Sequence, residues 1–322
     1  MNKNTKLWLI AAASLILIGI VIFGGVMSML KWDFTKLSTN KYETNEYKIN
    51  ENYNSISIVS NTADIVINPS EASESSVVCY ELKNMKHSVT VKDSTLVIEV
   101  VDSRKWYEHI SIGFDTPKIT VYIPQGEYTS LSISSDTGDV EIPDAFKFES
   151  IDISTSTGDI KNYASTSKAI KIKTSTGDIH VEKVSAGALD LSVSTGDVIA
   201  KSITCDGDVK IKVSTGITKL FDVTCKNVIS SGSTGDIYLK NVIASEKFSI
   251  ERDTGYVKLE RCDAYEIFIE TDTGDVTGTL LSEKVFIPRT DTGSVKVPQT
   301  VTGGRCEITT DTGNIRIDIV SN

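Results

Sequence analysis

The dipeptide Thr-Gly recurs along the chain after residue 130 at a nearly constant spacing, and this repeat limits the possible folds more than any other feature. Successive glycines of the dipeptide are 19 or 20 residues apart. The ten glycines are Gly138, Gly158, Gly177, Gly196, Gly216, Gly235, Gly255, Gly274, Gly293 and Gly313. A fixed period of this length indicates that one small structural unit stacks on the next.

Residues on both sides of each glycine alternate between apolar and polar, which is typical of β-strands. The fifth residue before the glycine is usually Ile, as in Ile153, and the second residue after it is usually Val or Ile, as in Ile160. Each unit is therefore predicted to be strand, tight turn, strand, turn. Glycine suits the tight turn because it adopts a positive φ at no steric cost.

One unit of this size cannot cover its own apolar side chains, so neighbouring units must cover them. We therefore predict an all-β fold, an elongated parallel β-solenoid of 19–20-residue coils over residues 131–322. Residues 49–130 keep the alternation without the Thr-Gly period, and we expect an irregular N-terminal β-region there. Within it, Thr62-Ala63-Asp64 is interpreted as a degenerate turn of the repeat. Asp102 to Pro117, with Trp106, Tyr107 and His109, is interpreted as an inserted loop.

The N-terminal segment Leu7 to Leu30 contains no charged residue. As a helix it would be about 36 Å long, which exceeds the roughly 30 Å hydrocarbon core of a bilayer. We predict a short cytoplasmic N-terminus (1–6), a single transmembrane anchor (7–30) and a stalk linker (31–48). A long, cleaved signal sequence is the alternative. Lys3 and Lys6 favour a cytoplasmic N-terminus, which places the C-terminal domain outside the cytoplasm at the cell membrane.

The chain is acidic, with a formal net charge of −10 and a pI near 5.0. A negative protein does not condense on phosphate backbones, so nucleic acid is not a predicted partner. The lysines of the strands are interleaved with Asp and Glu, which predicts a solvated face and not a basic stripe.

Carboxylates follow many of the turn glycines, and stacking would place them in rows. Like charges about 5 Å apart repel each other unless solvent, backbone N–H groups or a cation compensates them. Calcium takes oxygen ligands of this kind, so the sequence offers four calcium candidates. They are Asp139, Asp159, Asp178 and Asp197. We favour an ordinary turn-capping role for them, with no metal and no cofactor, because Asp commonly caps backbone N–H groups in turns.

No motif in the sequence predicts catalysis. Asp-Thr-Gly, the short signature of aspartic proteases, occurs at the phase of the repeat, and the repeat accounts for it. Its copies begin at Asp136, Asp253, Asp272, Asp291 and Asp311. The three histidines have no metal-ligand spacing. The five cysteines form no CxxC pair, and Cys205 and Cys225 share a repeat position with alanines, which indicates packing. We therefore predict that the chain is not an enzyme.

The residues also carry a family resemblance. The run from Lys118 to Pro124, the segment from Tyr128 to Val140 and the repeated Ser-Thr-Gly-Asp-Ile units resemble the bacterial putative-adhesin family with β-strand repeats. This family is a domain of unknown function that includes LiaG-like proteins of the Gram-positive envelope. The resemblance covers the chain from about residue 50 to its end. It implies an anchored, surface-exposed β-solenoid without an established activity.

These observations predict a non-enzymatic, membrane-anchored protein of the cell envelope that acts as an adhesin or binding scaffold. The expected partner is an envelope protein or a cell-wall glycan. Because the last strand, Ile315 to Ile319, has no evident cap, self-association through this C-terminal edge is also expected. Two alternatives remain, an accessory component of an envelope-stress sensing system and, more remotely, a carbohydrate-active β-helix enzyme.

Overall fold

The computed structural model describes the chain except for residues 1, 39, 71–73, 107–112, 114 and 321–322. It divides into two compact units. The first comprises Met1–Glu43, Leu82–Met85 and Asp102–Asp115, and the second comprises Thr44–Glu81, Lys86–Val101 and Thr116–Asn322. Tyr107 and His109 of the expected loop lie outside the described residues.

The first unit contains the helix α1 (Lys3–Met29), followed by the short 3-10 helix η1 (Phe34–Leu37). The part from Asn4 to Met29 is long and apolar enough to cross a membrane, and its most apolar stretch, of mean hydropathy 2.7, is not buried within the protein. A single apolar helix at the N-terminus fits a membrane anchor or a signal sequence. It begins four residues before the predicted span.

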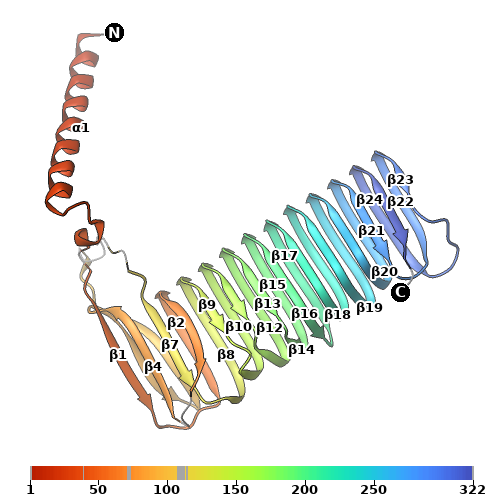
Figure 1. The fold of residues 1–322 in the computed structure, drawn as a ribbon, viewed down its shortest axis with the longest axis horizontal. Coiled ribbons are helices and arrows are strands. Elements are labelled where there is room, and N and C mark those ends of the chain that lie inside the picture. Colours follow the sequence, from red (N-terminus) through yellow and green to blue (C-terminus); the bar gives the residue numbers. More distant parts are fainter. Residues whose placement is uncertain (1, 39, 71–73, 107–112, 114, 321–322) are drawn as a thin grey trace. The chain divides into compact units, whose positions relative to one another are not determined.

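The second unit contains a stack of parallel coils (Figure 1). In each coil a longer strand ends at the Thr of Thr-Gly, and a second strand begins two residues after the glycine. The strands of the regular part are β8 (Gly126–Thr137), β9 (Val140–Ile142), β10 (Phe146–Thr157), β11 (Ile160–Asn162), β12 (Ser165–Thr176), β13 (Ile179–Glu182), β14 (Ser185–Ala186), β15 (Ala188–Thr195), β16 (Val198–Cys205), β17 (Asp208–Thr215), β18 (Thr218–Thr234), β19 (Ile237–Thr254) and β20 (Val257–Thr273). The predicted parallel β-solenoid is confirmed.

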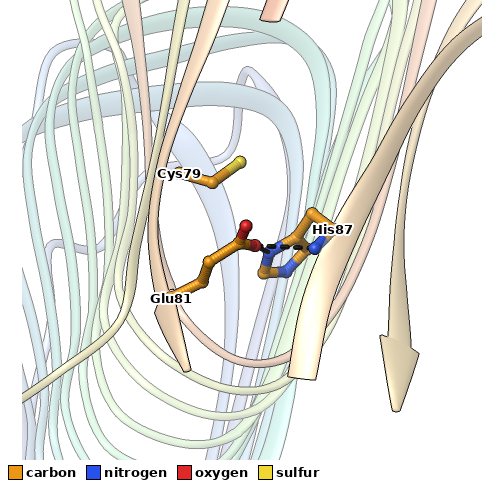
Figure 2. A group of neighbouring side chains, drawn as sticks. All are labelled: Cys79, Glu81 and His87. Atoms are coloured by element: carbon orange, nitrogen blue, oxygen red, sulfur yellow. Dashed lines mark hydrogen bonds and ion pairs between the residues drawn. The ribbon is translucent and has the colours of Figure 1, made fainter. Parts of the chain in front are cut away.

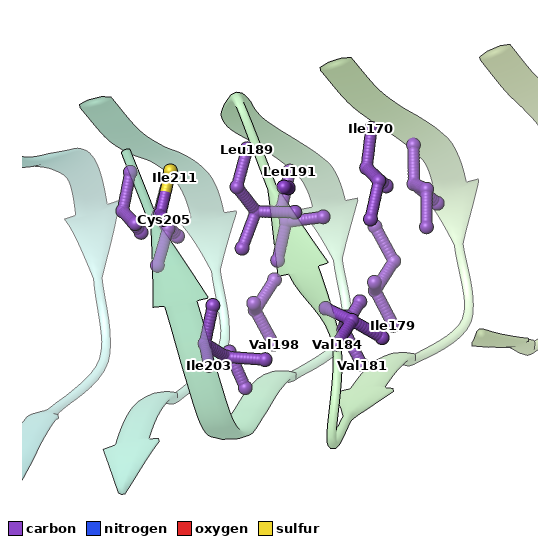
Figure 3. Close-up of a cluster of buried hydrophobic side chains, with 14 of the residues drawn as sticks. Ile170, Ile179, Val181, Val184, Leu189, Leu191, Val198, Ile203, Cys205 and Ile211 are labelled. Atoms are coloured by element: carbon purple, nitrogen blue, oxygen red, sulfur yellow. The ribbon is translucent and has the colours of Figure 1, made fainter. Parts of the chain in front are cut away.

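Coils stack in register, so equivalent residues become neighbours. Ile153 of β10 pairs with Ile172 of β12, which pairs with Leu191 of β15. These apolar side chains point inward and form one continuous core, which also contains Cys205, Ile211 and Leu189 (Figure 3). All five cysteines are buried and have free thiols. Removing apolar surface from water stabilises the stack by about 25 cal/mol for each Å² buried, and this burial holds the coils together.

The N-terminal end of the stack does not follow the order of the chain. The strands are β1 (Tyr42–Ile49), β2 (Ser55–Thr62), β3 (Asp64–Pro69), β4 (Ser75–Leu82), β5 (Met85–Lys92), β6 (Thr95–Asp102) and β7 (Lys118–Ile123). β2 and β3 pair with β8 and β9 on one side and with β6 and β7 on the other. The coil formed by β2 and β3 is therefore inserted between two coils that come later in the sequence.

Beyond this inserted coil, β4 runs antiparallel to β7, and β1 pairs with β4. Thr62 lies in register with Thr137, so the solenoid begins within the region expected to be irregular. The stalk expected over residues 31–48 differs as well, because β1 occupies its second half. Alternating residues of β1, such as Tyr47 and Ile49, face the core and draw this segment into the sheet.

The C-terminal end is also out of order. The last strands are β21 (Val276–Leu280), β22 (Lys284–Thr292), β23 (Val295–Lys296), β24 (Gly304–Thr312) and β25 (Ile315–Ile319). β24 pairs with both β20 and β22, and β25 pairs with both β21 and β23. The last coil of the chain is thus the second-last coil of the stack.

The prediction that Ile315 to Ile319 forms the open edge was wrong for its first two residues. Ile315 and Arg316 pair with β23 as well as with β21, so β22 and β23 form the edge there, whereas Ile317 to Ile319 pair with β21 alone. Pro288 explains why β22, and not β24, lies at the edge of the stack. Proline lacks an N–H group and is tolerated on edge strands but not in the middle of a sheet.

Candidate functional site

The Thr-Gly corner is the most regular feature of the stack. All ten glycines have a φ between 125° and 159°. A Cβ atom added to any of them would lie 1.9 to 2.2 Å from a backbone carbonyl oxygen of the neighbouring coil. Glycine is thus required both by the backbone conformation and by the close approach of adjacent coils.

The carboxylates after these glycines form a ladder along the stack. Asp139 Oδ1 accepts the backbone N–H of Asp159 at 2.8 Å, and Asp159 Oδ1 accepts that of Asp178 at 2.8 Å. Asp178 and Asp197 continue the series by accepting the N–H groups of Asp197 and Ile217. Each of these aspartates therefore satisfies a backbone donor in the next coil, which is the turn-capping role favoured above.

The calcium alternative for Asp139, Asp159, Asp178 and Asp197 stays an untested prediction. Among the residues that the structure describes, these aspartates do not converge with further acidic, His or Cys side chains into a group of three donors within 4.8 Å. The Asp-Thr-Gly segments also lie at equivalent positions of neighbouring coils. Thr273 pairs with Thr254 and Thr312, and Thr312 pairs with Thr292, so the four C-terminal copies form one row.

Opposite charges alternate along the outward face of the long strands. Asp152, Lys171, Asp190 and Lys210 are neighbours in this order on four successive coils. Lys171 Nζ lies 3.7 Å from Asp152 Oδ2. This register produces a solvated face of mixed charge, as predicted from the interleaved lysines.

One corner departs from the repeat and carries a buried arginine. Arg252 is 1% exposed, and its Nη1 donates to the carbonyl oxygen of Val213 at 2.8 Å, two coils away. The guanidinium passes Gly232, where a Cβ atom would lie 2.3 Å from Nη1. Burial lowers the pKa of Arg252, and the charges of Asp253 and Asp236 oppose this shift. The contacts indicate an internal brace between coils.

A groove crosses the stack where the long strands of the first regular coils begin. Its volume is about 480 Å³. Its walls combine aromatic, hydroxyl and charged side chains of β8, β10, β12 and β14. The register places Glu127 beside Lys147 and Tyr128 beside Phe148. The lining residues are Glu127, Tyr128, Thr129, Lys147, Phe148, Glu149, Ser165, Thr166, Ser167 and Ser185.

The aromatic wall of this groove is held in place from behind. The Tyr128 hydroxyl donates to the carbonyl oxygen of Pro124 at 2.7 Å. Its ring stacks with that of Tyr53, at 6.2 Å between centroids, and contacts that of Phe148 at 5.6 Å. Burial, followed by the influence of Tyr53, raises the pKa of Tyr128 to about 12, so the hydroxyl stays protonated. The groove therefore has a preorganised aromatic surface.

A second cluster of chemistry-bearing residues lies inside the N-terminal end of the stack. Cys79 and Glu81 are alternate residues of β4, and His87 lies on β5; the three side chains point toward one another (Figure 2). They are 0%, 1% and 4% exposed. Their donor atoms all lie within 4.8 Å of one another, the only group of three such donors found in the described part of the chain.

Hydrogen bonds organise this cluster. Glu81 Oε2 accepts from the backbone N–H of His87 at 2.6 Å and lies 2.7 Å from His87 Nδ1, while Glu81 Oε1 accepts from Asn45 Nδ2 at 2.6 Å. Burial, followed by the charge of Glu81, raises the pKa of the Cys79 thiol to about 12. Without a further ligand, Cys79 is therefore a thiol and not a thiolate nucleophile.

Ser60 extends the cluster, with its Oγ 3.5 Å from His87 Nε2. Hydroxyl, imidazole and carboxylate then follow in the order of a hydrolase triad. Ser60 is only 4% exposed, however, and a nucleophile must reach its substrate. The arrangement in its present closed form gives no support to hydrolysis, and the absence of enzymatic activity stays a prediction.

Sequence reasoning missed both the groove and the buried cluster. Spacing among the three histidines does not reveal the cluster, because the neighbours of His87 in it are a cysteine and a glutamate eight and six residues earlier. The available signal was Cys79 and Glu81 at alternate positions of one strand, because alternate residues share a face. For the groove, the signal was Tyr128 and Phe148, which lie one repeat apart.

These features define a class, the parallel β-solenoids, in which coils of one repeat present grooves and rows of side chains along a stack. Within this class, the Toastrack DUF4097 family model matches residues 53–214 and 203–322. The chain therefore belongs to the Toastrack DUF4097 family. Among curated proteins, none matches this chain.

Several solved structures are similar in fold. A putative adhesin from Parabacteroides merdae is 14% identical with a TM-score of 0.50, and the match covers 87% of this chain and 98% of that one. A putative adhesin from Bacteroides fragilis is 16% identical with a TM-score of 0.45, covering 87% and 99%. A putative lipid binding protein from Parabacteroides distasonis is 16% identical with a TM-score of 0.46, covering 87% and 98%. At these identities the likeness concerns the fold alone.

Proposed function

We propose that this protein is a non-enzymatic binding scaffold, anchored in the cell membrane by α1 with its coil stack outside the cytoplasm, and that the groove around Tyr128 and Phe148 binds cell-wall glycan. The apolar helix and the lysines that precede its core support the anchor and its orientation. The groove is the observation that carries the proposed function.

The lining of the groove suits a sugar polymer. A pyranose ring has an apolar C–H face and a rim of polar groups. The partly exposed ring of Tyr128, backed by the buried ring of Phe148, offers an apolar wall for the ring face. Around it, Ser165 and Ser167 offer hydroxyl groups for the polar rim. Binding sites commonly combine such an apolar wall with a few placed polar groups in a volume of about 300–1,000 Å³.

Charge in the groove fits a glycan that carries both amides and carboxylates. Lys147 offers a cation, while Glu127 and Glu149 offer acceptors for hydroxyl and amide groups. Glu149 is also paired with Lys168 at 2.5 Å, which fixes its carboxylate at the rim. A groove of mixed charge does not favour a strongly acidic or strongly basic protein segment, and so we favour a glycan over an envelope protein.

The proposal is tested by titrating the full-length chain in detergent micelles with soluble cell-wall glycan strands. Because Lys147 and Glu127 are exposed, their replacement by Ala should leave the fold intact and weaken binding about tenfold or more, the equivalent of about 1.4 kcal/mol. Lys171→Ala, on the same stack but away from the groove, is the matched control and should bind normally. Equal binding by all variants, or no binding by the original chain, would refute the proposed site.

A further inference from the structure

We propose that Cys79, Glu81 and His87 bind one Zn²⁺ ion inside the N-terminal end of the coil stack, as a site that ties β4 to β5. These side chains form the closed cluster of Figure 2. The inference is independent of the proposed glycan groove, because the two sites share no residue.

The identity of the donors points to this metal. Thiolate, imidazole and carboxylate are the three ligand types that Zn²⁺ accepts in proteins, at bond lengths of about 2.0–2.3 Å. Calcium and magnesium take oxygen ligands, and a cysteine would be a poor ligand for either. Three protein donors leave the fourth position of a tetrahedral ion to another ligand.

The geometry needs only small adjustments. Bonds of about 2.0–2.3 Å in a tetrahedron place donor atoms roughly 3.3–3.8 Å apart. Here the donor atoms all lie within 4.8 Å, and Glu81 Oε2 and His87 Nδ1 are 2.7 Å apart. An ion entering between them would take the place of the hydrogen bond between these two atoms. Alternation along β4 already directs Cys79 and Glu81 to the same side.

The charges balance when the ion is bound. The ligand forms are the Cys79 thiolate, the Glu81 carboxylate and neutral His87, so two negative charges meet two positive ones. Binding releases the thiol proton of Cys79 to solvent, and the neutral His87 ring that coordinates through Nδ1 carries its one proton on Nε2, which faces Ser60. A net charge of zero matters because the three side chains are at most 4% exposed, and a buried net charge would cost much free energy.

Neighbouring residues orient the donors. Asn45 Nδ2 donates to Glu81 Oε1 at 2.6 Å, which leaves Oε2 directed at the imidazole. The Tyr47 hydroxyl donates to the carbonyl oxygen of His87 at 3.0 Å, and Ser60 Oγ lies 3.5 Å from His87 Nε2. Metal-bound histidines usually have a partner at the second ring nitrogen, and Ser60 occupies that place.

The test uses the full-length chain in detergent micelles, reduced and stripped of metal. Titration with Zn²⁺ against a chromophoric chelator should show one tight equivalent per chain. Cys79→Ala should abolish this equivalent, and Asn45→Ala, a positioning change, should weaken it about 10–100-fold. Cys306→Ala removes another fully buried thiol far from the cluster and should bind Zn²⁺ like the original chain.

A second measurement keeps the test decisive if Cys79→Ala does not fold. Co²⁺ added to the original chain should give the thiolate-to-cobalt charge-transfer band in the near ultraviolet, together with the visible bands of a tetrahedral ion. Absence of a tight Zn²⁺ equivalent, absence of the thiolate band, or unchanged binding by a folded Cys79→Ala variant would each overturn the proposal.

Discussion

The two ends of the coil stack are closed in different ways. At the N-terminal end, β4 runs antiparallel to β7, a strand of the outermost coil. Glu81 of β4 and His87 of β5 form a buried pair there. At the C-terminal end, the outermost coil leaves Val285, Ile287 and Val295 38%, 44% and 45% exposed. A repeat determines how each coil covers the next, but it does not determine what covers the first and the last coil. The ends therefore use residues that no repeat position predicts.

The largest expected effect is at a regular corner. Gly177→Ala places a Cβ atom 2.2 Å from the carbonyl oxygen of Gly158 and forces alanine to a φ of 128°. Strain and overpacking together should cost about 3 kcal/mol or more in the free energy of unfolding, or prevent folding. Gly126→Ala is the matched control, since nothing lies within 4 Å of its added Cβ. Denaturant unfolding of both variants measures the difference, and similar stabilities would contradict the account.

The next effect is confined to the N-terminal end. Glu81→Leu removes the partner of buried His87 and should cost about 3 kcal/mol, as expected when one member of a buried pair is lost. Glu182→Leu is the control, because Glu182 pairs with His180 at 3.2 Å in a more exposed place and should matter far less. Hydrogen exchange should report faster opening of β4 and β5 in the first variant, with the regular coils unchanged. Equal effects of the two changes would show that the buried pair has no special role.

An effect of similar size is expected at the irregular corner in the middle of the stack. Gly232→Thr alone should be destabilising by about 3 kcal/mol, since its Cβ atom would lie 1.7 Å from the carbonyl oxygen of Val213 and 2.3 Å from Nη1 of Arg252. Adding Arg252→Thr restores the hydroxyl that neighbouring coils carry at this position and should recover part of the loss. Thermal unfolding of the single and double variants measures the coupling between the two residues. Purely additive effects would mean that Gly232 and Arg252 do not depend on each other.

The smallest effect concerns the carboxylate ladder. Asp178→Ala removes the acceptor of the Asp197 N–H and should cost about 1 kcal/mol, whereas Asp178→Asn keeps an acceptor oxygen and should cost less. Millimolar calcium or a chelator should not shift the melting temperature, because the ladder oxygens already serve backbone donors. A rise of many degrees with calcium would instead support the calcium alternative for Asp139, Asp159, Asp178 and Asp197.

Local sequence patterns predicted the coils well because their causes are local. The Thr-Gly-Asp corner and the inward Ile and Val columns act within one coil and its neighbour, and even the degenerate turn at Ala63 falls in register. The stacking order at the ends depends on pairing between distant segments. Ser55 pairs with Ser130, and no periodic signal connects these two positions.

The candidate sites were less predictable for a related reason. Asp139 and its equivalents were found because they recur, although their hydrogen bonds to the next coil required the structure. The Cys79, Glu81 and His87 cluster occurs once and depends on how β4 and β5 come together. The groove likewise exists only when Tyr128 and Phe148 are stacked on adjacent coils.

The most direct test of the proposed function is photo-cross-linking in living cells that produce the full-length chain. A photoreactive residue is placed at Ser167 in the groove or, as the control, at exposed Ser194 on a later coil. The account predicts that light attaches cell-wall glycan to the chain labelled at Ser167, and that cell-wall hydrolases then release it with sugar still bound. Glycan attachment only at Ser194, or attachment of a protein instead of a glycan at Ser167, would contradict it.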